Sequence, residues 1–189
     1  MTSALAWLAA PQLDPVAAVQ PALPGRAGER YDGLLGRTPD GGLVPVDLLA
    51  GPEGRAGALR AAVPPGAALA RCTAVWVHTG RLCPDRPDVV VGAGRRLHTT
   101  VVVHRQHLAV SDVVHLGGVP TTTPLRTAVD LLCFASEPVA VAGTCALLLA
   151  GLEEPLVQEV LGRPGRRAPV RRATALLAVA GDAAGRRRS

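Results

Sequence analysis

The sequence contains no lysine, so all 20 of its basic residues are arginine. This absence excludes an active site of the restriction-endonuclease type, which needs a Glu-x-Lys strand beside a second acidic residue to hold Mg²⁺. With 21 glycines and 17 prolines, the arginine bias is also typical of a GC-rich genome, and arginine content alone therefore indicates no function. Aromatic residues make up only 2% of the chain, so its core must be built from Val, Leu and Ala.

The four cysteines contain no C-x-x-C pair and do not form the pattern of a disulfide framework. Cys133 and Cys145 fall on apolar helical faces, and we expect buried free thiols in a reducing cytoplasm. The N-terminus lacks the basic region of a signal peptide. The apolar run 139–152 is too short for a bilayer and is interrupted by Gly143 and Thr144. The sequence therefore predicts a soluble, cytoplasmic protein that makes no membrane contact.

Motifs of the common enzyme classes are missing as well. There is no G-x-S-x-G elbow, and the glycines at 92 and 94 lack the spacing and the following helix of a nucleotide-binding loop. Four histidines cluster around the expected strands, but their spacing is not that of a zinc site, and we expect surface or edge histidines: His98, His104, His107 and His115. The sequence thus predicts no catalytic residue, no metal and no cofactor.

The charge is unevenly distributed along the 189 residues. Pro155–Ser189 holds eight arginines against two acidic residues, a net charge of +6, whereas residues 1–154 hold 12 arginines against 13 acidic residues, a net charge of −1. A basic end on a near-neutral body favours a polyanionic partner, first of all nucleic acid. The hydrophobic content of 48% predicts a packed core rather than disorder, and the length fits one domain or one small domain with an appendage.

The local patterns predict an α+β fold with a short β-sheet packed with several helices. β-Branched and apolar runs indicate strands, and apolar residues at a spacing of three and four indicate helices. We expect strands at 88–91, 98–104 and 112–116, and helices at 67–80, 138–149, 156–161 and 166–180.

The best-specified stretch is 118–133, which follows a Gly117-Gly118 turn between two extended pieces. Thr123 is a good N-cap, and Pro124 suits the first helical position, where an N–H is not needed. Arg126 and Asp130 are four residues apart, so they share a helix face. We favour an ion pair that holds this helix to a neighbour over a functional pair.

Residues 41–66 have the outline of a helix-turn-helix, with a helix near 45–50, a turn, and a second helix near 55–63. In such a motif the second helix enters the major groove, and Arg55 and Arg60 would contact bases or phosphates. Two small packing helices with no role in DNA binding explain the pattern equally well.

The basic C-terminal part begins with an arginine-rich segment ahead of the last expected helix. Arginine at a helix N-terminus opposes the helix dipole, which makes more sense if an anionic partner lies there. We expect five arginines of this segment to contact phosphates: Arg163, Arg166, Arg167, Arg171 and Arg172.

The order of these segments resembles the AbiEi-type antitoxin-like proteins of actinobacteria. The resemblance covers about residues 41–182 and is carried by the segments 67–80, 88–91, 101–105, 112–114, 118–131 and 163–172. It implies an N-terminal winged helix-turn-helix, with Arg55 and Arg60 in its recognition helix, followed by an α/β antitoxin domain. Arg126 and Asp130 match the family's central Arg-Thr-x-x-Asp signature.

The resemblance implies promoter binding, autorepression of a toxin–antitoxin operon and opposition to a nucleotidyltransferase-like toxin. Many relatives continue into a domain similar to very-short-patch-repair endonucleases, and this sequence ends at Ser189, where that domain would start. We divide the chain into an arm or weakly ordered helix (1–40), a degenerate helix-turn-helix-like segment (41–66), an AbiEi-like α/β domain (67–182) and a basic tail (183–189).

The sequence therefore predicts a non-enzymatic, antitoxin-like regulator that binds the double-stranded DNA of its own promoter and has a possible cognate toxin. Two alternatives remain open. One is a protein-interaction module that neutralises a partner toxin without binding DNA, and the other is a relic or accessory of a nuclease.

Overall fold

The computed structural model describes residues 33–92, 100–163 and 169–188, so most of the expected arm and part of the expected strand 98–104 lie outside it. The described chain begins with an antiparallel pair of short strands, β1 (Leu35–Arg37) and β2 (Leu43–Pro45). The 3-10 helix η2 (Val46–Leu49), the helix α2 (Pro52–Ala58) and the 3-10 helix η3 (Arg60–Ala62) follow. The helix expected near 45–50 is thus a 3-10 helix, and the second helix ends earlier than expected.

A mixed five-stranded sheet forms the centre of the molecule, in the order β5-β4-β3-β7-β6. β3 is parallel to β7 and β4 to β5, whereas β3–β4 and β6–β7 are antiparallel. The strands are β3 (Ala67–Leu69), β4 (Asp88–Val91), β5 (Val102–Arg105), β6 (Val113–Leu116) and β7 (Val119–Thr122).

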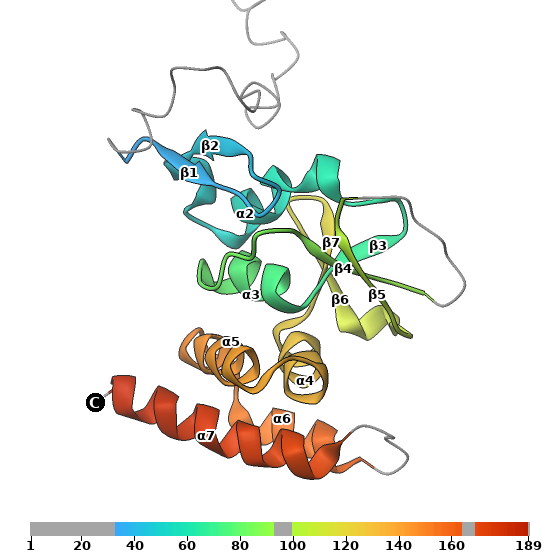
Figure 1. Ribbon diagram of the computed structural model, residues 1–189, viewed down its shortest axis with the longest axis vertical. Helices are drawn as coiled ribbons and strands as arrows, with labels where there is room; N and C mark the ends of the chain where they lie inside the picture. Colours follow the sequence, from blue (N-terminus) through green and yellow to red (C-terminus); the bar gives the residue numbers. More distant parts are fainter. Residues whose placement is uncertain (1–32, 93–99, 164–168, 189) are drawn as a thin grey trace, which may run out of the picture.

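Five helices complete the structure: α3 (Arg71–Thr79), α4 (Pro124–Phe134), α5 (Glu137–Leu149), α6 (Glu154–Gly162) and α7 (Val170–Arg188). α3 lies between the sheet and the remaining helices (Figure 1). Its Trp76 and Val77 pack with the sheet, and its Val75 packs with α4 to α7. The α+β fold is therefore confirmed.

The core has the composition that the lack of aromatics predicts. Its fully buried large side chains are all Leu or Val, among them Leu69 at the centre of the sheet and Leu131 in α4. Cys133 and Cys145 are buried and are not in a disulfide bond, as expected. None of the helices in the described ranges is long and apolar enough to cross a membrane.

Two boundaries differ from the sequence prediction. Ala67–Leu69 is a strand and not the first turn of a helix, because it pairs with β4 on one side and with β7 on the other. α7 continues to Arg188, so residues 183–188 are helical and not a loose tail. In both places long-range pairing and packing decide a structure that the local pattern leaves open.

α2 and η3 are fixed to the sheet by polar contacts as well as by the buried Ala56 of α2. Arg60 Nη2 donates to Gly117 O in the β6–β7 turn at 2.7 Å, and Gly117 N donates to the Glu53 carboxylate. The β1–η3 segment therefore belongs to the same packed body as the sheet.

His78 joins the end of α3 to the end of β7. Its Nε2 lies 2.8 Å from Thr122 O, and Nε2 must carry the proton because a carbonyl only accepts. Burial lowers the pKa of His78 below its ordinary value, the nearby Arg55 lowers it further, and the hydrogen bond to Thr122 opposes both. His78 is thus held as the neutral imidazole.

This depressed pKa predicts that the protein loses stability in weak acid. As pH falls through the ordinary value of 6.5, the unfolded chain protonates His78 before the folded protein does. Each pH unit by which the two pKa values differ lowers the free energy of unfolding by about 1.4 kcal/mol once the pH is below both values. Urea unfolding should show that the free energy of unfolding falls more between pH 7.5 and pH 5.0 in the wild type than in His78→Gln, whose side-chain amide can still donate to Thr122 O. Equal losses would contradict the assignment.

Candidate nucleic-acid interface

The N-terminus of α4 presents the Arg126 and Asp130 pair. Thr123 caps the helix, since its hydroxyl accepts from Arg126 N at 3.2 Å, and Pro124 occupies the first turn. Thr123 N also donates to Asp112 O at 2.9 Å, which fixes the entry of the helix against the segment before β6. The predicted capped helix is confirmed, and it places Arg126 in the first turn of the helix, facing the chain between β5 and β6.

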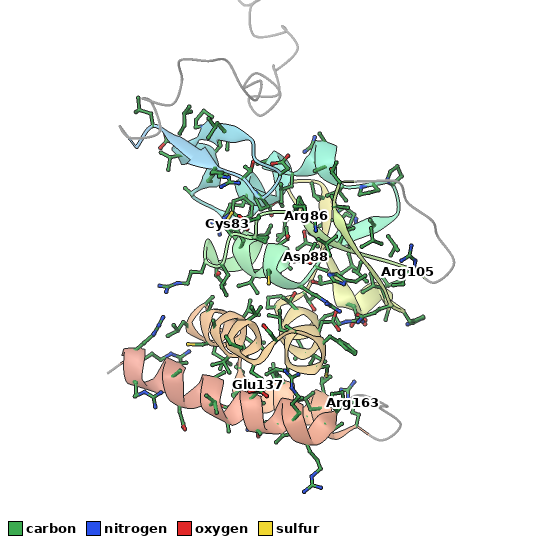
Figure 2. All side chains as sticks on the ribbon, viewed as in Figure 1. Cys83, Arg86, Asp88, Arg105, Glu137 and Arg163 are labelled. Atoms are coloured by element: carbon green, nitrogen blue, oxygen red, sulfur yellow. The ribbon has the colours of Figure 1, made fainter. Side chains whose placement is uncertain are left out.

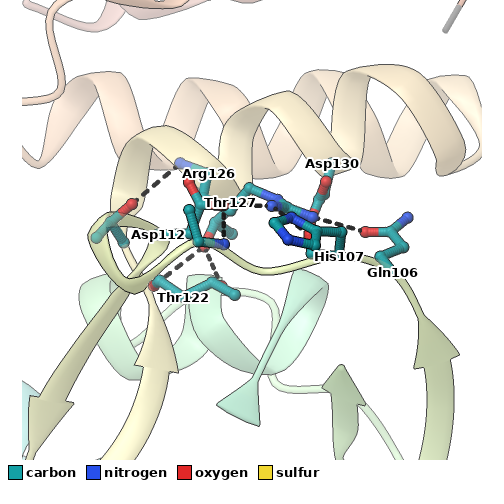
Figure 3. A network of polar contacts seen from close by, with 9 residues as sticks. Gln106, His107, Asp112, Thr122, Arg126, Thr127 and Asp130 are labelled. Carbon is teal, nitrogen blue, oxygen red and sulfur yellow. Dashed lines mark hydrogen bonds and ion pairs between the residues drawn. The ribbon is translucent and has the colours of Figure 1, made fainter. Parts of the chain in front are cut away.

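Arg126 contacts four partners at once (Figure 3). Its Nε donates to Asp130 Oδ2 at 2.9 Å, and its Nη2 donates to Gln106 Oε1 at 3.0 Å. Its Nη1 donates to Asp112 Oδ2 at 2.6 Å and to His107 O at 3.1 Å. One guanidinium therefore ties α4 to the segment 106–112.

Burial and charge pairing act against each other in this network, and burial prevails at Asp130. It raises the pKa of Asp130, although the positive charge of Arg126 acts in the opposite direction. Burial would lower the pKa of Arg126, but the Asp130 and Asp112 carboxylates raise it above the ordinary value. The Arg126 side chain is 14% exposed and that of Asp130 is 5% exposed. Arg126 and Asp130 therefore form an ion pair within α4, and the contacts that hold α4 to its neighbour are those of Arg126 with the segment 106–112.

Arg55, the first predicted DNA contact, points into the protein. It is 7% exposed, and its Nε donates to Val77 O at 2.8 Å. Its Nη1 donates to Leu49 O at 2.8 Å and to Ala50 O at 3.1 Å. Because this guanidinium is occupied by three carbonyls that end η2 and α3, the prediction that Arg55 contacts DNA does not fit the structure.

Arg60 and Arg172 are also engaged with the main chain, although both reach the surface. Arg60 binds Gly117 O, as described above. Arg172 donates to Leu132 O at 3.2 Å and to Ala135 O at 2.8 Å, at the C-terminal end of α4. Its side chain is 33% exposed. Each can meet a phosphate only with the part of the guanidinium that remains accessible.

Two of the predicted contacts lie free of the core. Arg171 is exposed in the first turn of α7. The side chain of Arg163 is 63% exposed and pairs with Glu159 one helical turn earlier, a pair of little energetic value at such exposure. Figure 2 shows Arg163 at the surface beside α7. Arg166 and Arg167 lie outside the described residues.

The basic tail predicted at 183–189 is a second basic cluster that the structure builds into α7, and its helical form was not predicted. Arg186, Arg187 and Arg188 form the last turn of this helix and are exposed. Arg188 also donates to Leu148 O near the end of α5. Leu177, Ala180 and Ala184 recur at helical spacing on the buried face, and this spacing could have predicted that the helix continues beyond residue 180.

The histidines and acidic residues of the described ranges include no group of three or more that could hold a metal ion. His104 Nε2 lies 2.8 Å from Asp88 Oδ1, on neighbouring strands, which gives this histidine a structural partner. His98 lies outside the described residues.

A cavity of about 380 Å³ opens between His78, the start of α4 and the α5–α6 turn, and Leu125, Leu152 and Leu156 line much of it.

Comparisons with known proteins give no family for this chain. No family model and no curated protein matches the sequence. Among solved structures, the crystal structure of RV2827C protein from Mycobacterium tuberculosis matches with 19% identity and a TM-score of 0.44. The match covers 83% of this chain and 67% of that chain. This similarity is too low to carry an argument, and the AbiEi resemblance stays a prediction.

Replacing Arg126 by Gln should destabilise the protein by about 3 kcal/mol, because it leaves the buried Asp130 without its counter-charge. The double variant Arg126→Gln/Asp130→Asn should be less destabilised than the sum of the two single variants, since the residues share one interaction. Urea unfolding of all four proteins gives the coupling energy. Additive effects would contradict the role of Arg126 at the centre of the network.

Arg55→Lys separates an internal role from a phosphate contact. Lysine keeps the charge that a phosphate would need, but it cannot reproduce the fork that binds Leu49 O, Ala50 O and Val77 O. We expect a loss of about 2 kcal/mol of unfolding free energy from the unpaired carbonyls. Arg81→Lys, on an exposed arginine, is the matched control and should be neutral. Unchanged stability of Arg55→Lys would restore Arg55 as a candidate DNA contact.

Proposed function

We propose that the protein is a non-enzymatic, antitoxin-like transcriptional regulator that acts in the cytoplasm and binds the double-stranded DNA of its own promoter. The observation that carries this proposal is the outer face of α7. Along this face Arg171, Ala175, Val179, Asp182 and Arg186 follow one another at intervals of four, four, three and four residues, and all are exposed.

This arrangement suits a phosphate backbone. Arginines stand at both ends of the stripe, about 22 Å apart at the rise of an α-helix. The small side chains of Ala175 and Val179 between them allow the helix to lie close to a flat or convex partner. Asp182 is the acidic exception on the stripe. Two arginine clusters at this separation can meet phosphates several base-pair steps apart, which positions a protein on DNA without specifying sequence.

The antitoxin part of the proposal rests on the family resemblance. It implies promoter selectivity and a cognate toxin, and the exclusion of common catalytic motifs from the sequence agrees with a regulator that has no activity of its own. Because Arg55 is internal, α2 is not proposed as a recognition helix. The stripe on α7 supplies affinity, and selectivity for the promoter is a separate property that the experiment below measures.

Fluorescence anisotropy with the protein's own upstream DNA and a scrambled duplex, over a salt series, tests this proposal. Arg171→Gln/Arg186→Gln should weaken binding to both duplexes and reduce the slope of log K against log salt by about two, since each phosphate contact contributes about 0.9. Arg81→Gln, with the same change in charge per site, should leave the slope unchanged.

Each outcome of that titration has a definite meaning. Tighter binding to the upstream duplex than to the scrambled one supports a promoter-binding regulator. Equal loss of affinity per removed charge in the α7 variant and in Arg81→Gln would show that only the overall charge matters, and would contradict the role of the stripe. Absence of binding at low salt would favour the protein-interaction module instead.

A further inference from the structure

Phe134 is the only phenylalanine in the sequence, and it is not in the core. It is the last residue of α4 and is 50% exposed. Aromatic side chains bury the most apolar area. In a chain with so few of them, this ring would be expected to lie in the core. Its place at the surface therefore needs another explanation.

An arginine from the neighbouring helix covers part of this ring. The guanidinium carbon of Arg71 lies 5.6 Å from the Phe134 ring centre, within the distance of a cation–π contact. The Nε of Arg71 is buried and has no hydrogen-bond partner among the described residues. The side chain thus faces the ring without the carbonyl partners that hold Arg55 and Arg172.

The backbone of Arg71 is strained in this position. Its φ is +46°, in the left-handed region that favours glycine. It is the first residue of α3, directly after the buried strand β3. A strained arginine that lies against a half-exposed ring is an arrangement that stability alone does not favour, and such strain concentrates where a protein binds something.

The surroundings of the ring are basic. α4 lies between α3 and α7 in the molecule (Figure 1). Arg172 of α7 donates to Ala135 O, the residue next to Phe134, and Arg171, which precedes Arg172 in α7, is exposed. Glu137 Oε1 lies 3.8 Å from Arg172 Nε and is the acidic member of this group. Asp130, also close to Arg71, is already paired with Arg126.

We propose that Phe134 and Arg71 form a stacking site for an unpaired nucleobase, so that the protein binds single-stranded nucleic acid at the junction of α3, α4 and α7. The accessible part of the ring stacks on the base, Arg71 fixes the ring from its other side, and Arg171 and Arg172 contact the flanking phosphates. Aromatic rings and arginines are the two groups with which proteins hold unpaired strands without reading their sequence.

This site goes beyond the proposed binding of duplex DNA and depends on Phe134 and Arg71, which the duplex contacts do not use, although both sites share Arg171. Inside a duplex each base is stacked on its neighbours and cannot reach Phe134, whereas the α7 stripe needs only phosphates. Phe134 and Arg71 are absent from the stripe, and changes at these two residues therefore test the stacking site without touching the proposed duplex contacts.

The experiment uses the full chain and a 12-nucleotide oligothymidine that carries one central 2-aminopurine, whose fluorescence is quenched on stacking. An oligonucleotide of the same length made of abasic sites and a 12-base-pair duplex are the comparison ligands. We expect the wild type to quench the probe and to bind the base-containing strand about tenfold more tightly than the abasic strand.

Three variants then assign the effect to the ring and to the arginine. Phe134→Leu should lose the quenching and about tenfold in affinity for the single strand, with duplex binding unchanged. Phe134→Tyr keeps an aromatic face and should retain both. Arg71→Gly should weaken single-strand binding while its melting temperature stays equal or rises, because glycine accepts the positive φ without strain.

The opposite results would overturn the inference. Equal affinity of the wild type for the abasic and base-containing strands would show that phosphates alone are bound. Unchanged quenching in Phe134→Leu would remove the ring from the site. A lower melting temperature of Arg71→Gly with unchanged single-strand affinity would show that Arg71 is only a structural residue.

Discussion

The described structure depends on the pairing of main-chain carbonyls at helix ends with arginine side chains. The last carbonyls of a helix have no partner within it, and each must be satisfied from outside. Here arginines do this at the ends of η2 and α3 (Arg55), of α4 (Arg172) and of α5 (Arg188). Arg126 holds His107 O and two carboxylates in the same way. In a chain without lysine, the planar fork of arginine joins elements that are distant in sequence.

This use of arginine divides the positive charge into two populations. Arg55 and Arg126 are internal, and each bonds several partners at once. Arg171 and Arg186 are exposed on α7 and remain available to a polyanion. The net charge of +5 therefore does not describe the surface evenly. The charges of Arg55 and Arg126 are taken up by internal contacts, whereas those of the exposed arginines on α7 are available to a partner. The proposed duplex contacts follow this division, and Arg71, which faces Phe134, belongs to neither population.

The parts of the fold that could be predicted are those encoded over one helical turn or one β-turn. Thr123, Pro124, Arg126 and Asp130 act within eight residues, so the capped helix and its ion pair could be read from the sequence. Ala67–Leu69 could not, because two alanines and a leucine carry no strand signal and only their pairing with β4 and β7 makes them extended. The internal role of Arg55 was equally hidden, since its partner Val77 O is 22 residues away. The stacking of Arg71 on Phe134 depends on a contact between two helices that no local pattern shows.

The most direct test of the division between internal and surface arginines is the NMR spectrum of the arginine Nε–Hε groups, recorded with and without the upstream duplex. The account predicts that the signals of Arg171 and Arg186 shift as DNA is added, while those of Arg55 and Arg126 stay in place because their Nε–H groups are bonded to Val77 O and to Asp130. Shifts at Arg55 with unchanged signals for Arg171 and Arg186 would contradict it, and would return the DNA contact to the segment around α2.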